Sequence, residues 1–99
     1  MQKTYVGMVL DQYGGMTATG AIIKDAWLFG LLPETETCAG WDLNRIQSVY
    51  DQTQVEWDKY GCLVSNLPPA LRERHGRIHA LAIERAKSLG WEPEMYLSE

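Results

Sequence analysis

Two histidines, His75 and His79, are the residues of this chain whose type and spacing best fit a chemical site. Side chains four positions apart on a helix lie on one face, one turn apart, and neutral imidazoles are common ligands of zinc. A structural zinc ion takes four ligands, so the pair supplies half of a site. Cys62 and Cys38 are the candidates for the other half.

The spacing of Cys62 gives this metal hypothesis some support. Twelve residues separate Cys62 from His75, and three separate the two histidines. This spacing resembles the second half of a zinc finger with two cysteines and two histidines, but no second cysteine stands shortly before Cys62 to begin the motif. The alternative is that His75 and His79 are half-buried residues bonded to tyrosine hydroxyls, carboxylates or carbonyls.

Signatures of catalysis are absent from the sequence. Residues 15–20 have the glycine spacing of a phosphate-binding loop, but Ala21 and Ile22 stand where lysine and serine or threonine are required. No serine has the context of a nucleophile elbow, and no pair of acid and base residues stands out. We therefore expect a protein that is not an enzyme and needs no cofactor, zinc being the one exception under consideration.

Charge and composition narrow the class of partner. The net charge is −4, and the basic surplus is confined to residues 66–90, with five basic and two acidic side chains. Nucleic-acid binding needs a broader basic surface, so we expect no nucleic-acid partner. No apolar run approaches the roughly 18 residues of a membrane span, which predicts no membrane insertion. Two cysteines in a chain of this size favour free thiols and a cytoplasmic location.

The hydrophobic periodicity predicts one all-α domain over residues 1–99, a compact bundle of about four helices. The first would span residues 4–13, although the same residues also suit a strand. The second, over 17–29, is apolar nearly all round, which is typical of a central helix.

Two longer helices complete the predicted bundle. The third spans residues 42–60, and Thr53 is the weak point of its core-facing stripe, which consists of Leu43, Ile46, Tyr50, Thr53, Trp57 and Tyr60. The fourth spans 68–89, with Pro69 at its first position and Gly90 at its end. Residues 92–99 are expected to form a loose tail.

One flank of the fourth helix is a candidate binding surface. At 100° per residue, Arg74, Arg77 and Arg85 surround Leu81 beside the apolar arc. Arginine pairs with carboxylates while its stem covers apolar surface, which suits protein contacts. The alternative is that these arginines pair with acidic residues of the third helix, namely Asp51, Glu56 or Asp58.

Trp41 and Trp91 are the other candidates for partner binding, because each follows a glycine at the boundary of an element. Exposed tryptophans at such positions are enriched in interfaces, whereas buried ones would close the ends of the bundle. Taken together, these patterns predict a small accessory or regulatory protein that binds another protein or a second copy of itself. A zinc-binding domain is the alternative.

Overall fold

The computed structural model describes residues 4–92, which contain three α-helices and two short 3-10 helices. The α-helices are α1 (Ala18–Leu28), α2 (Leu43–Asp58) and α3 (Pro69–Ser88), and the 3-10 helices are η1 (Gln12–Gly14) and η2 (Val64–Asn66). The predicted all-α class is confirmed, with three helices instead of four. Within the described part of the chain, no helix has the length and apolarity needed to cross a bilayer.

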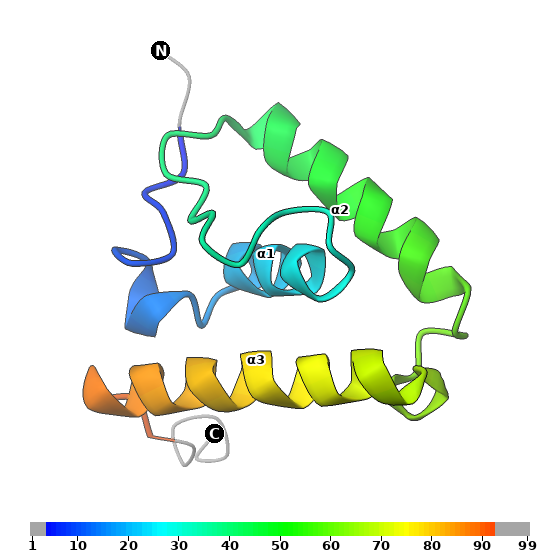
Figure 1. Cartoon of the computed structure of the whole chain (residues 1–99). Helices are drawn as coiled ribbons and strands as arrows, with labels where there is room; N and C mark the ends of the chain where they lie inside the picture. Colours follow the sequence, from blue (N-terminus) through cyan, green and yellow to red (C-terminus); the bar gives the residue numbers. More distant parts are fainter. Residues whose placement is uncertain (1–3, 93–99) are drawn as a thin grey trace, which may run out of the picture.

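Helix α1 lies between α2 and α3 in the view of Figure 1 and packs against both. Its start is fixed by Thr17, whose hydroxyl accepts a hydrogen bond from the Gly20 amide at 3.1 Å. Its end is fixed by Gly30, which adopts a positive φ of 72° while the Leu31 amide donates to the Ala26 carbonyl. The prediction of a central apolar helix is therefore confirmed.

Helix α2 begins where the sequence predicts, and its buried face overlaps the predicted stripe at Ile46 and Thr53, whereas Leu43 of that stripe is 62% exposed. The Asp42 carboxylate caps the helix by accepting from the Arg45 amide. The buried residues are Ile46, Val49 and Thr53. Interpreting Thr53 as the weak point was wrong, because its hydroxyl donates to the Tyr50 carbonyl and so enters the core with its hydrogen bond satisfied.

The prediction of a helix over residues 4–13 is wrong. Gly7 has a φ of 94°, and a Cβ there would lie 2.9 Å from the Ala39 side chain, so this stretch runs close beside the connector between α1 and α2. The backbones pair through Tyr5 and Met8, whose amides donate to the carbonyls of Trp41 and Thr37. This pairing is not a regular strand either, since Thr4 makes only an isolated bridge to Asp42.

Asp11 ties this N-terminal segment to α1. Its carboxylate accepts hydrogen bonds from the hydroxyls of Tyr5 and Thr17 at 2.5 and 2.6 Å, and from the Gln12 amide at 2.7 Å. Burial alone would raise the pKa of Asp11, but these bonds outweigh it and lower the pKa. The cap of α1 and the start of η1 therefore share one carboxylate.

Helix α3 has the ends predicted from its prolines and glycine. Pro69 occupies its first turn, and Gly90 follows its last residues with a φ of 98°. The Trp91 amide then donates to the Ala86 carbonyl at 2.9 Å, which turns the chain back toward the helix. Of the predicted tail over 92–99, residues 93–99 lie outside the described part of the chain.

Two buried clusters form the core, and Trp27 packs against both. The first contains Met8, Ile23 and Cys38. The second contains Leu28, Leu67 and Ile78. The Trp27 indole nitrogen donates to the Glu36 carbonyl at 3.0 Å, which also anchors the connector that follows α1. One side chain of the central helix therefore links the N-terminal segment, the connector and α3.

Two helical glycines give a test of this packing. A Cβ at Gly20 would lie 1.9 Å from the backbone oxygen of Gly15, whereas a Cβ at Gly76 would meet nothing within 4 Å. We expect Gly20→Ala to lower the free energy of unfolding by about 3 kcal/mol, because backbone must move to admit the methyl group. Gly76→Ala should raise it by about 0.5–1 kcal/mol through helix propensity.

Denaturant unfolding followed by circular dichroism measures both variants. If Gly20→Ala were as stable as the parent, the close approach of Gly15 to α1 would be disproved.

Candidate binding site

His75 and His79 lie together on the inner side of α3. Both are half-buried, and their rings stack with centroids 4.1 Å apart and planes inclined by 29°. The rings of Trp57 from α2 and His75 form a T-shaped pair, with centroids 6.5 Å apart and planes inclined by 80°. Within residues 4–92 neither imidazole makes the hydrogen bond to a tyrosine, carboxylate or carbonyl that the core interpretation predicted. Stacking and burial hold the pair instead.

Two charged residues of α1, Lys24 and Asp25, interact electrostatically with the histidine pair. Lys24 is only 7% exposed, and burial lowers the pKa of its ammonium. Burial raises the pKa of Asp25, although the Trp57 indole donates to its carboxylate at 3.2 Å. Burial, the neighbouring His75 and the Lys24 ammonium together lower the pKa of His79 to about 4. The His79 imidazole is therefore neutral at physiological pH.

The cysteines do not join the histidines. Cys62 is exposed after α2, with its sulfur 3.8 Å from the Asp58 carboxylate, and Cys38 is buried in the cluster of Met8 and Ile23. Over residues 4–92 no three His, Cys, Asp or Glu side chains form a group that could hold a metal ion. The zinc hypothesis is left with two ligands out of four.

Two of the three arginines of this flank pair within the chain, but with partners other than the acidic residues expected from the sequence. Arg77 makes two hydrogen bonds to the Glu34 carboxylate, at 2.7 and 2.9 Å. Arg74 donates to the Leu28 carbonyl at 3.1 Å, at the end of α1. The Arg85 guanidinium has no hydrogen-bonding or ionic partner among residues 4–92. Arg85 is therefore the one arginine of this flank that is available to a ligand.

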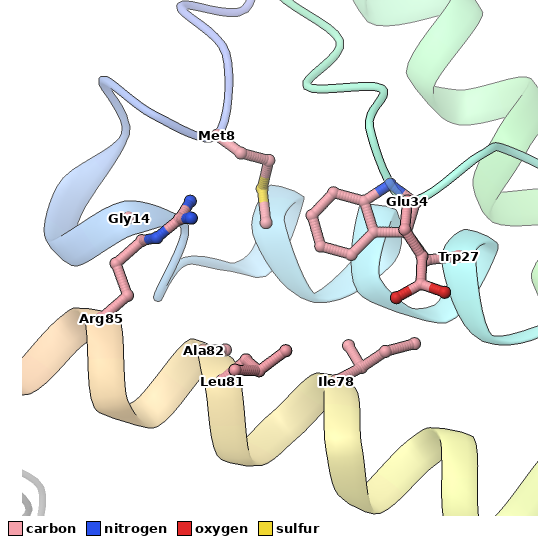
Figure 2. Close-up of a pocket in the computed structure, with 8 residues that line it drawn as sticks. All are labelled: Met8, Gly14, Trp27, Glu34, Ile78, Leu81, Ala82 and Arg85. Carbon is pink, nitrogen blue, oxygen red and sulfur yellow. The ribbon is translucent and has the colours of Figure 1, made fainter.

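A partly open pocket of about 150 Å³ lies beside Arg85. Figure 2 shows Met8 reaching in from the N-terminal segment, Trp27 from α1, and three apolar side chains from α3. Arg85 and Glu34 lie at opposite ends of the pocket in this view. The full lining consists of Met8, Gly14, Trp27, Glu34, Ile78, Leu81, Ala82 and Arg85.

Gly14 positions the Arg85 side chain at the pocket. A Cβ on Gly14 would lie 2.9 Å from the Arg85 Cδ and 3.1 Å from its Cγ, and the residue has a φ of 72°. The arginine stem therefore packs directly on the backbone of η1, which holds the guanidinium at the end of the pocket.

The two tryptophans proposed for partner binding are largely covered. Trp91 is 9% exposed and packs at the end of α3, and Trp41 is half-buried with the Arg45 guanidinium 3.7 Å above its ring. This geometry favours the interpretation in which they close the ends of the bundle. The pocket residues Met8, Gly14 and Glu34 were not anticipated, since they lie in segments whose position depends on contacts distant in sequence.

Comparison of the chain with family models, curated proteins and solved structures found no match. The site is a pocket lined mainly by apolar side chains, with Arg85, which has no partner among residues 4–92, at one end.

The buried histidine predicts a pH dependence of stability. His79 stays neutral in the folded protein down to about pH 4, whereas in the unfolded chain it gains a proton below about pH 6.5. The unfolded state therefore binds more protons between these values, and stability falls as the pH is lowered through this window. Because the imidazole is half-exposed, we expect a loss of about 1–2 kcal/mol.

Urea unfolding of the parent and of His79→Gln at several pH values isolates this effect, since the variant should lose less stability over the same window. An NMR titration that placed the His79 pKa at 6.5 or above would contradict the burial of this ring.

The paired imidazoles alone should bind zinc weakly, because a structural site needs four ligands. After dialysis against micromolar zinc, we expect less than about a tenth of an equivalent bound, and no change in circular dichroism on addition of a chelator. Cys62→Ser should behave as the parent does. One full equivalent of zinc that is lost in His75→Ala would instead support the metal-binding alternative.

Proposed function

We propose that this chain is a non-enzymatic accessory or regulatory protein that binds another protein chain through one face of α3. The face consists of Leu81, Arg85 and Leu89 together with the adjoining pocket. The observation that carries the proposal is the pocket itself, which combines an apolar lining with an arginine that has no partner among residues 4–92.

The spacing and exposure of these side chains support a contact surface. Leu81, Arg85 and Leu89 follow one another at four-residue intervals, so they share one side of the helix. Leu81 is 55% and Leu89 53% exposed. A Cβ built on Gly14 would approach both Arg85 and Leu89, so these two side chains lie around η1 beside the pocket. Apolar residues combined with arginine are typical of the centre of protein interfaces.

The environment of the cysteines supports a reducing compartment such as the cytoplasm. Both thiols are free, and burial raises the pKa of the Cys38 thiol to about 11. A thiol with such a pKa is a poor nucleophile, which also supports a role without thiol catalysis.

Selection from a random peptide library, together with sedimentation equilibrium of the protein alone, tests this function. We expect either enriched peptides or self-association, and we expect Leu81→Glu with Leu89→Glu to weaken the contact at least about tenfold, because a buried charge at the centre of an interface is costly. The control is Val55→Glu, at a residue on α2 that is 61% exposed.

The double variant must keep the circular dichroism of the parent for the comparison to hold. The proposal fails if peptides are not enriched and the protein stays monomeric at millimolar concentration. It also fails if the contact weakens as much in Val55→Glu as in the double variant.

A further inference from the structure

Building on the proposed function, we infer that the pocket receives the C-terminal residue of a partner chain, an aromatic residue whose α-carboxylate pairs with Arg85. Three observations support this assignment: the volume of the pocket, the positive charge of Arg85, and the position of this charge within the same pocket.

The volume sets the size of the group that enters. A pocket of about 150 Å³ is small beside the 300–1,000 Å³ of ordinary small-molecule sites. An apolar cavity of this size holds one benzene ring. The lining side chains of Met8, Trp27 and Ile78 offer the apolar contacts that a phenyl ring requires. The pocket therefore accommodates one aromatic side chain.

The charges at the two ends of the pocket differ in availability. Glu34 is already held by two hydrogen bonds from Arg77, and these bonds lower the pKa of its carboxyl. Arg85 has no such partner within residues 4–92. A ligand that enters the pocket therefore meets one uncompensated positive charge, and a planar guanidinium matches a carboxylate with two parallel hydrogen bonds.

The apolar lining and Arg85 lie close together, which favours a chain terminus over an internal acidic residue as the ligand. In an extended segment, adjacent side chains point to opposite faces, so an acidic neighbour of the buried aromatic would point away from Arg85. On a helix, the nearest acidic residue on the same face would stand on the next turn, with its Cβ about 5–6 Å away, so a second side chain would have to supply the carboxylate beside the ring. In a C-terminal residue, the carboxylate and the side chain share one Cα, and one residue therefore satisfies both the apolar lining and Arg85.

N-acetyl-L-phenylalanine, a mimic of such a terminus, tests the inference against its uncharged amide. Binding is followed by NMR shifts of the Ile78 and Leu81 methyl groups and of the Trp27 indole. We expect a Kd on the order of 1 mM for the acid, as ligand efficiency predicts for its size, and binding at least about fivefold weaker for the amide. In Arg85→Gln the difference between acid and amide should disappear, while Arg72→Gln, which removes an arginine outside the pocket, should preserve it.

A second variant tests the apolar part separately. Ala82→Met fills the pocket from α3 and should weaken the acid and the amide equally. The inference is overturned if acid and amide bind the parent alike, if Arg85→Gln leaves their difference intact, or if the shifts map away from the pocket. The comparison of the two probes on the parent protein needs no variant, so it decides the matter even if Arg85→Gln fails to fold.

This experiment distinguishes the inference from the proposed function on which it rests. Peptides that bind the α3 face in the library selection, combined with equal affinity for acid and amide, would retain the function and reject the terminal carboxylate. Strong preference for the acid without any peptide or protein binding would retain the pairing of a carboxylate with Arg85 and reject a protein chain as its source.

Discussion

The packing of Trp27 against both core clusters is the constraint on which the rest of the structure depends. The N-terminal segment contributes Met8 to one core cluster and α3 contributes Ile78 to the other. The Trp27 ring packs against the buried residues of both clusters. Its indole nitrogen is bonded to the Glu36 carbonyl, so the ring is fixed in orientation as well as in position. The same ring forms one wall of the pocket, which ties the candidate binding site directly to the core.

Small residues make this arrangement possible at the other end of α1. The backbone of Gly15 passes so close to Gly20 that no Cβ fits between them, and Gly14 leaves room for the stem of Arg85. At each of these contacts, the N-terminal segment lies closer to a helix than a residue with a Cβ would allow. The pocket exists because the N-terminal segment, including η1, is held this tightly against α1 and α3.

Local signals in the sequence were sufficient to predict where the helices begin and end. Thr17 and Asp42 accept the capping hydrogen bonds, Pro69 begins α3, and Gly30 and Gly90 adopt the left-handed conformation that stops a helix. These signals act within a few residues, so they can be recognised without knowing the rest of the fold.

The N-terminal segment could not be predicted in this way, because its conformation depends on a partner distant in sequence. The apolar spacing over residues 4–13 predicts a helix, whereas Tyr5 and Met8 pair with a connector about thirty residues away. The candidate site shares this difficulty. Helical projection places Leu81 and Arg85 on one flank, but only the placement of the N-terminal segment and connector against α3 brings Met8 to them.

The central claim is that Trp27 forms one wall of a preformed apolar pocket between the N-terminal segment and α3. NMR of the protein under xenon pressure tests this claim most directly, because xenon enters apolar cavities without requiring any particular ligand chemistry. The account predicts saturable shifts of the Ile78, Leu81 and Ala82 methyl signals and of the Trp27 ring, with little change around His75 and His79. Xenon shifts that are absent, or that are spread evenly over the surface, would contradict it.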